Sequence, residues 1–472
     1  MNDQQSGFFN MLAVVCCAAL VVATVLPSIV RHRTVARSTA CANNLSQLGL
    51  GIHNYHSAYK QLPPGCGGTT GDDIPEKNNA GRLGPLVAIS PFVEQQRLWE
   101  QIANPLVNAT TGDKFPAMGP VPWFDADRYT PWSQSPEVYQ CPESFAAEQQ
   151  QPDAKVVFTL TIPGEHGSDV TTCYVTCYGD GTENAGALVD PEDFESVRRA
   201  RANNRGMFQA GLPLKFRDML DGLSNTIMLS ETIASVQGKQ GISGIAKNVA
   251  NLSEEPRVCL DVLKDPTTQW WAQGRGSRWS DGLLAVSGFQ TVLPPNSPSC
   301  TSELGMFDSV VAASSSHDGG VHVLFGDGAV KFITNTIDCG DLSVPGVALG
   351  RQGASAPGSQ SPYGIWGALG TRASKETIDR NVGEVVARDR RNVFARGRVK
   401  AQPLSTWTSK SGDERLQARF VRILDQKTIE LEGKTGVLHR VPLNTLAAKD
   451  IYRAVQMDLL AKQRDAEKAD SK

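Results

Sequence analysis

The chain has 472 residues, which is more than one compact domain usually holds and enough for two or three. Its formal net charge is -3, from 46 Lys and Arg against 49 Asp and Glu, which excludes a protein drawn onto nucleic acid by its overall field. Charged residues make up 20%, while Gly 44 and Pro 27 are numerous, a mixture typical of turn-rich β structure rather than of a helical bundle or a disordered chain.

The amino terminus contains a predicted membrane span. Residues 8–30 carry no charged side chain and, at about 1.5 Å per helical residue, are long enough to cross a hydrocarbon core of about 30 Å. The stretch is longer than a signal-peptide core, and Arg31, His32 and Arg33 follow it where a cleavage site would lie. We therefore expect a short leader at 1–7 and a retained transmembrane helix at 8–30 that contacts membrane lipid.

The cysteines indicate which side of the membrane holds the rest of the chain. Taken alone, the arginines after the span favour the cytoplasm under the positive-inside rule. Two of the 10 cysteines lie in the span, and the other eight form an even set typical of disulfides in an oxidising compartment, with eight buried thiols as the alternative. We therefore expect the globular part on the outer, periplasmic side of the cytoplasmic membrane. The disulfide candidates are Cys41, Cys66, Cys141, Cys173, Cys177, Cys259, Cys300 and Cys339.

Residues 31–62 are predicted to continue the span as a helical stalk, because apolar residues recur at helical spacing until a Pro-Pro-Gly sequence ends the pattern. His53 and His56 lie three residues apart and form a candidate metal pair. Packing or stacking against a sheet is the favoured interpretation, because no third ligand is near in sequence. Cys173 and Cys177 have the wrong spacing for a zinc knuckle, so we expect no metal and no cofactor. The apolar stripe consists of Val35, Leu45, Leu48, Ile52 and Tyr55.

A β-rich domain is predicted over residues 63–375. Residues 156–162 and 321–333 are rich in β-branched and aromatic residues, and Asp327 and Gly328 supply a tight turn within the second stretch. That stretch is a predicted hairpin, with His317 fixing the entry of its first strand. A second turn at 221–225 leads into a strand at 226–231 that Glu231 is expected to cap.

Two functional alternatives accompany this structural interpretation. His317, Asp318, His322 and Asp327 could form a metal or acid–base set, but about nine extended residues separate His317 from the turn, so we expect no catalytic residue there. No nucleophile elbow, Walker loop, dinucleotide fingerprint or zinc-protease motif is present in the sequence. Aromatic residues could instead form a sugar-stacking platform, although core packing is the favoured interpretation for them: Tyr174, Tyr178, Trp270, Trp271 and Trp279.

The composition changes after Thr371. Residues 376–404 form a basic linker, and residues 405–456 carry short alternating strands separated by turns, which predict a small barrel. Residues 457–472 form a charged tail.

The order of several sequence blocks resembles a large family of prepilin-like bacterial envelope proteins of unknown function, marked by an H-X9-DG processing-associated domain. The H-X9-DG motif corresponds here to His317, Asp327 and Gly328. The resemblance implies a candidate processing site between Gly7 and Phe8. The matching blocks are Gly7-Phe8, 41–50, 53–56, 63–65, 216–218, 221–227, Glu231, 279–282, 293–300, 316–320, 327–328 and 366–372.

In the pilin-like fold, the long amino-terminal helix packs its apolar stripe on a β-sheet, so the resemblance implies close approaches at Gly49 and Gly51. Prepilins usually have a basic leader and a Glu at the fifth position after the cleavage site, where this chain has Leu12. The missing basic leader and the missing Glu argue against both leader cleavage and filament assembly. In that case the helix serves simply as an anchor.

The carboxy-terminal strands resemble the first homology domain of the yeast cytoskeletal adaptor Sla, an SH3-like barrel, through Trp407, residues 418–421 and residues 441–443. The resemblance implies a protein- or peptide-binding module. The expected fold class is therefore α+β, with a pilin-like amino-terminal helix on a β-rich domain and an SH3-like barrel after it.

The leading hypothesis is a non-catalytic, membrane-anchored pilin-like protein of the cell envelope with a role in secretion, adhesion or surface architecture. Its expected partners are other pilin-like subunits or secretion components, a peptide or protein ligand of the barrel, and no nucleic acid. A surface protein that binds or processes polysaccharide is the alternative.

Overall fold

The computed structural model describes residues 33–71, 74–144, 170–235, 241–376, 405–408, 415–424, 428–433 and 438–442. The chain divides into two compact units, Met1–Asp379 and Arg380–Lys472. The expected span at 8–30, the Gly7-Phe8 site, the strand at 156–162 and the tail at 457–472 lie outside the described residues. Within the described residues, no helix is both long and apolar enough to cross a bilayer.

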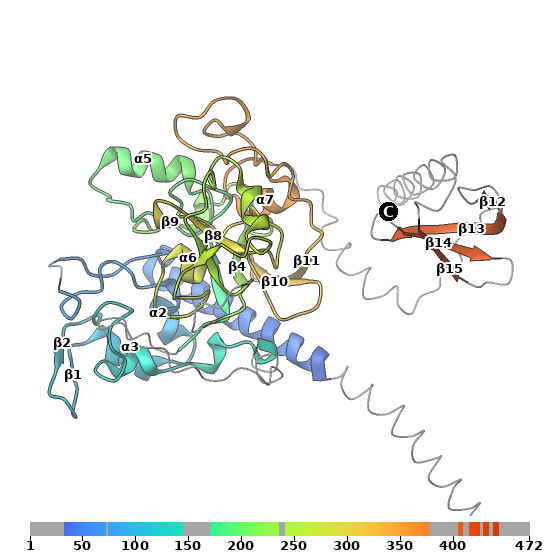
Figure 1. Cartoon of the computed structure of the whole chain (residues 1–472). Helices are drawn as coiled ribbons and strands as arrows, with labels where there is room; N and C mark the ends of the chain where they lie inside the picture. The colour runs from blue at the N-terminus through green and yellow to red at the C-terminus, as the bar shows by residue number, and fades with distance from the viewer. Residues whose placement is uncertain are drawn as a thin grey trace, which may run out of the picture. The chain divides into compact units, whose positions relative to one another are not determined.

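The first helix of the described chain covers residues 33–59 and lies against the strands of the first unit (Figure 1). Leu45, Leu48 and Ile52 are fully buried, as the predicted apolar stripe requires, whereas Val35 is exposed. The close approach expected at Gly49 is confirmed, because a Cβ there would lie 2.9 Å from Leu324 Cδ2. Gly51 also makes a close approach, since a Cβ there would lie 2.6 Å from the Cγ1 atom of Val93, but Val93 belongs to none of the strands, so the expected approach to the sheet is wrong at this position.

A five-stranded sheet with the order β11-β10-β4-β3-β7 supports this helix. Its strands are antiparallel neighbours except for β3 and β7, which are parallel. The predicted hairpin is confirmed as β10 and β11, which pair from Gly320 opposite Thr334 to Leu324 opposite Val330. The predicted strand after the 221–225 turn is β4. The bounds are β3 Tyr174–Cys177, β4 Ile227–Glu231, β7 Gly288–Phe289, β10 Gly320–Phe325 and β11 Val330–Thr334.

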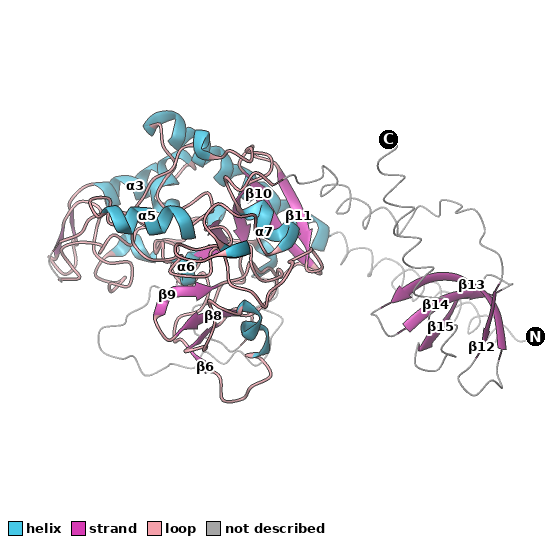
Figure 2. Cartoon of the chain, turned by 90° about the horizontal axis from the view of Figure 1, so that it is seen from above, coloured by secondary structure: helices cyan, strands magenta, loops and turns pink. Residues whose placement is uncertain are grey.

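A second sheet of the first unit has the order β6-β5-β8-β9, and β1 pairs with β2 in a separate two-stranded ribbon. Loops and turns connect these short strands over long stretches (Figure 2), so strands form the smaller part of the described residues between 63 and 375, where a β-rich domain was expected. The numerous Gly and Pro residues, which suggested β structure, are equally suited to the turns and loops that make these connections. The bounds are β1 Leu106–Val107, β2 Lys114–Phe115, β5 Ile245–Lys247, β6 Gln269–Trp270, β8 Ser299–Ser302 and β9 Gly305–Val310.

Short helices cover the remaining parts of the first unit. The α-helices are α2 Pro85–Ile89, α3 Gln96–Ala103, α5 Phe194–Asn203, α6 Leu284–Ser287 and α7 Gly364–Gly370. The 3-10 helices are η1 Ser90–Phe92, η2 Thr130–Ser133, η3 Glu137–Tyr139, η4 Phe216–Asp218, η5 Pro256–Asp261 and η6 Gly353–Ser355.

The core of the first unit lies between the first helix, the short helices and the sheet. Leu324 of β10 and Leu229 of β4 pack with the helix stripe in the main apolar cluster. Tyr174, Tyr178 and Trp279 belong to the same cluster and are essentially inaccessible to solvent. A second cluster surrounds Cys259 and Cys300. The mixed α+β class is therefore confirmed for this unit.

The second unit contains a four-stranded antiparallel sheet in the order β12-β13-β14-β15. Short strands were expected within residues 405–456, and the structure has β12 Ser405–Thr408, β13 Arg415–Leu424, β14 Thr428–Gly433 and β15 Leu438–Pro442. The described strands do not close into a barrel, because β12 and β15 each pair with a single neighbour. Consecutive strands joined by short turns satisfy the alternating pattern equally well as an open meander, so the pattern did not require closure.

Candidate functional site

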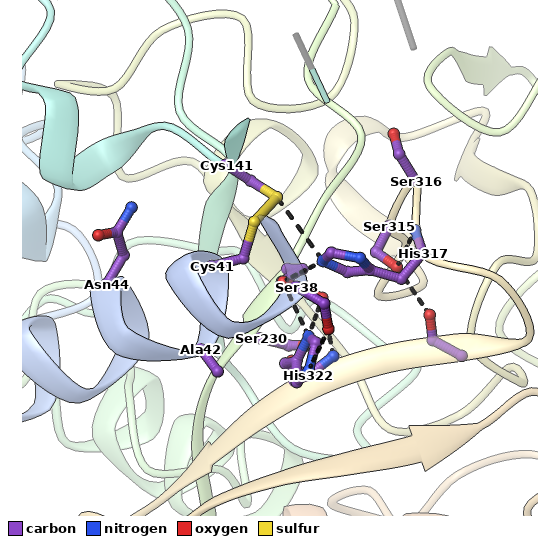
Figure 3. A network of polar contacts seen from close by, with 12 residues as sticks. Ser38, Cys41, Ala42, Asn44, Cys141, Ser230, Ser315, Ser316, His317 and His322 are labelled. Atoms are coloured by element: carbon purple, nitrogen blue, oxygen red, sulfur yellow. Dashed lines mark hydrogen bonds and ion pairs between the residues drawn. A yellow bond between two sulfur atoms is a disulfide. The ribbon is translucent and has the colours of Figure 1, made fainter. Parts of the chain in front are cut away.

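A buried polar cluster forms where the first helix meets the sheet beside the hairpin (Figure 3). The helix contributes Ser38 and Cys41, which are 9% and 0% exposed. Cys41 is joined by a disulfide to Cys141, with 5.0 Å between their Cα atoms. Because 100 residues separate the two cysteines, this bond fixes the helix to a distant part of the chain.

Glu231 brings a carboxylate into the centre of the cluster. It is the last residue of β4 and only 1% exposed. Its Oε2 accepts a hydrogen bond from the backbone N–H of His322 at 2.8 Å, and its Oε1 accepts one from His317 Nε2 at 3.1 Å. His322 Nδ1 donates to the same carboxylate at 3.2 Å. The side chain therefore binds two histidines and does not cap its strand, which corrects the expectation for Glu231.

The environment of Glu231 favours its charged form. Burial raises the pKa of this carboxyl, but the hydrogen bonds from His317 and His322 and the electrostatic interaction with their rings lower it by more, so that the pKa lies below its ordinary value. A buried carboxylate with three donors is thus held as an anion in the protein interior.

The two histidines connect the carboxylate to the helix and to the disulfide. His317 Nε2 lies 3.7 Å from Cys141 Sγ. His322 Nε2 accepts a hydrogen bond from the Ser38 hydroxyl at 3.4 Å, and the imidazole rings meet edge to face with 4.8 Å between their centroids. Figure 3 shows His317 beside the disulfide and His322 on the strand below it. The cluster is continuous from the first helix to β4 and β10.

The predicted turn at Asp327 and Gly328 is present between β10 and β11. Gly328 has a φ of 89°, and the Asp327 carboxylate accepts a hydrogen bond from the N–H of Ala329 at 3.0 Å. Asp318 and Asp327 are exposed, so the proposed set of four residues does not assemble. Only His317 and His322 come together, because they flank the start of β10 while Asp327 lies at its far end.

The His53–His56 pair faces Phe216 of η4. The ring centroid of Phe216 lies 4.6 Å from that of His53 and 4.4 Å from that of His56. His53 Nε2 also donates to the carbonyl oxygen of Gly326 at 2.9 Å. The two rings therefore stack on Phe216, in line with the favoured interpretation as packing or stacking residues.

The disulfide candidates divide into two groups. Cys41 pairs with Cys141 and Cys259 pairs with Cys300. The remaining four are buried thiols. The expectation that all eight cysteines form disulfides is therefore wrong, and so is the alternative of eight buried thiols. Cys173 and Cys177 cannot bridge each other, because four residues along an extended strand span about 13 Å, beyond the reach of a disulfide. The thiols are Cys66, Cys173, Cys177 and Cys339.

The aromatic platform is wrong for three of its five residues, since Tyr174, Tyr178 and Trp279 lie in the core. Trp271 is half-buried and donates its indole N–H to Thr301 Oγ1 at 2.8 Å. Large aromatic side chains remove a large apolar area from water when they are buried, which favours their place in the core.

Sequence reasoning missed the meeting of Glu231 with the two histidines and the disulfide. An acidic residue at the end of the mostly apolar strand Ile227–Glu231 was the available signal, because a buried carboxylate requires partners. Its partners follow 86 and 91 residues later, beyond the reach of local patterns.

The fold and the cluster define an α+β protein whose first helix packs on a five-stranded sheet and is joined by a disulfide to the segment after η3, next to a Glu–His–His group. A family model described as a protein of unknown function (DUF1559) matches residues 31–340, and the chain belongs to that family. The match covers the first helix, both sheets and all residues of the cluster. No curated protein and no solved structure matches the chain.

Proposed function

We propose that this protein is a membrane-anchored, pilin-like component of the bacterial cell envelope, with its globular part on the outer side of the cytoplasmic membrane. The observation that carries the proposal is the Cys41–Cys141 disulfide, which fixes the first helix to the unit close after the apolar segment 8–30. A helix attached in this way is held firmly to the globular unit, as a display protein anchored at its amino terminus requires.

The compartment follows from the two disulfides. Disulfides persist in oxidising compartments and are rare in the cytosol of most bacteria. Cys41–Cys141 and Cys259–Cys300 are both buried, and they close loops with sequence separations of 100 and 41 residues. Both belong to the structural framework of the first unit, which supports the periplasmic side over the side favoured by the arginines at 31–37.

The site supports a structural rather than a chemical role for the motif histidines. His317 and His322 are 7% and 6% exposed, and Glu231 saturates their inward-facing nitrogens. A general acid or base must reach its substrate within hydrogen-bond distance, which such burial prevents. The proposed role is therefore secretion, adhesion or surface architecture, with the carboxy-terminal unit as a peptide- or protein-binding module.

Cell fractionation tests the proposal. We expect the native chain in the membrane fraction, resistant to carbonate extraction and digested by protease added to spheroplasts. A matched chain that lacks residues 8–30 should become extractable without detergent. Recovery of the native chain in the soluble fraction, or its protection from external protease, would contradict the proposal.

A further inference from the structure

The geometry points to a redox-dependent zinc site: we propose that Cys41, Cys141, His317 and Glu231 bind one Zn²⁺ when the Cys41–Cys141 disulfide is reduced. Each residue offers one ligand atom to a common point, and these four atoms lie within 4.8 Å of one another. All four side chains are buried. This inference goes beyond the proposed function, which concerns the oxidised chain.

The separations between the ligand atoms fit tetrahedral zinc. With Zn–N and Zn–O bonds of about 2.0–2.1 Å and Zn–S bonds of about 2.3 Å, tetrahedral angles place N and O about 3.3 Å apart and N and S about 3.6 Å apart. The distance from His317 Nε2 to Glu231 Oε1 is 3.1 Å, and that from His317 Nε2 to Cys141 Sγ is 3.7 Å. The two sulfur atoms must separate to about 3.8 Å once the disulfide is reduced, and the other ligand atoms, which lie within 4.8 Å of one another, must settle at tetrahedral separations.

The outer contacts orient the ligands. The backbone N–H of His322 holds Glu231 Oε2 at 2.8 Å, which leaves Oε1 directed at His317. The Ser315 hydroxyl accepts a hydrogen bond from the backbone N–H of His317 at 3.1 Å. Partners of this kind set ligand orientation and strengthen metal binding in zinc sites.

The charge of the cluster is the same in both states. In the oxidised state, the neutral disulfide and the Glu231 carboxylate carry a total of −1. Zn²⁺ with two thiolates and the carboxylate also carries −1, so the buried region gains no net charge. Reduction of the disulfide without a metal would instead leave two thiols crowded at positions where their sulfur atoms had been bonded.

The chemical step balances with an external dithiol as the reductant. Thiol–disulfide exchange breaks the Cys41–Cys141 bond, gives two cysteine thiols and oxidises the dithiol to its own disulfide. Zinc binding then releases the two thiol protons to solvent, while the proton on His317 Nε2 moves to Nδ1 so that Nε2 can coordinate.

Zinc binding by the full 472-residue chain in detergent tests this site. The chain is reduced with a dithiol, freed of metal and mixed with Zn²⁺, and bound zinc is measured after gel filtration. We expect one Zn²⁺ per reduced chain and none retained by the oxidised chain. Bound zinc should slow alkylation of Cys41 and Cys141 at least 10-fold and leave Cys259 and Cys300 unprotected. Co²⁺ should give the visible spectrum of a tetrahedral thiolate complex.

Variants separate the site from other thiols. His317→Ala should weaken zinc binding at least 10-fold, whereas the matched Cys259→Ser/Cys300→Ser chain should bind zinc as the parent does. The proposal is overturned if the reduced parent chain takes up no zinc, whether it stays folded by circular dichroism or unfolds. Protection that falls on cysteines other than Cys41 and Cys141 overturns it as well.

Discussion

His53 on the first helix donates from Nε2 to the carbonyl oxygen of Gly326, 2.9 Å away, immediately before the Asp327-Gly328 turn. The same helix contacts His322 at the start of β10 through Ser38. The helix therefore holds β10 at both ends, and its Gly49 packs against Leu324 between them. The nine residues between the histidine and the turn of the motif correspond mainly to the strand on which the helix rests.

Removing the contact at the turn should cost a modest amount of stability. His53→Leu keeps apolar contact with Phe216 but loses the hydrogen bond to Gly326, so we expect the free energy of unfolding to fall by about 1 kcal/mol. The matched variant is His56→Leu, whose Nε2 accepts a longer bond of 3.4 Å from the N–H of Phe216 and should matter less. Urea unfolding of both variants measures the two losses of stability. A loss for His56→Leu that equals or exceeds the loss for His53→Leu would contradict the prediction.

The two glycines after the motif histidine serve different purposes. A Cβ at Gly320 would lie 2.1 Å from the carbonyl oxygen of Ile333 on the paired strand, whereas Gly319 has a φ of 80° and open space around it. Gly320→Asn should therefore destabilise the chain by about 2–4 kcal/mol. Gly319→Asn should cost less than about 1 kcal/mol, because Asn tolerates left-handed backbone. Similar melting temperatures for the two variants would contradict this assignment.

Arg275 stabilises the first unit through hydrogen bonds in its interior. Its guanidinium is fully buried and donates to the carbonyl oxygens of Leu284, Ala285, Gly288 and Ala312. Arg275→Met should lower the free energy of unfolding by about 3 kcal/mol or more, because these acceptors lose their partner in the interior. The control is Arg257→Met on the surface, where the ion pair with Glu255 is exposed and its loss should cost less than about 0.5 kcal/mol. Chemical denaturation with equal losses for both would refute the role given to Arg275.

Glu231 should make stability depend on pH in the acid range. Its folded-state pKa lies below its ordinary value of 4.5, so the native chain binds fewer protons at this group than the unfolded chain does. The stabilisation is fully present above about pH 4.5 and is lost as the pH falls through the folded-state value. Glu231→Gln should cost about 3 kcal/mol at pH 7 and should flatten the decline in melting temperature below pH 4.5. An unchanged acid profile in this variant would show that the carboxylate contributes nothing.

Local patterns predicted the elements that depend on neighbouring residues. The helix stripe, the β10–β11 hairpin and the strands β13 to β15 follow from periodicity and turn residues within about 15 positions. The Cys41–Cys141 bond and the Glu231–His317 contact join residues 100 and 86 positions apart, and no local spacing encodes them. Local sequence also fails to show which aromatic rings are buried, since nothing in the residues around Trp279 and Tyr174 distinguishes a buried ring from an exposed one.

Thiol trapping in intact cells tests the central claim most directly. Cells that produce the native chain are treated with an alkylating agent before lysis, and the peptides are analysed by mass spectrometry without reduction. A protein displayed outside the cytoplasmic membrane should yield crosslinked peptides for Cys41–Cys141, which holds its first helix to the rest of the unit, and for Cys259–Cys300. Quantitative alkylation of all four cysteines in the folded chain would contradict the account.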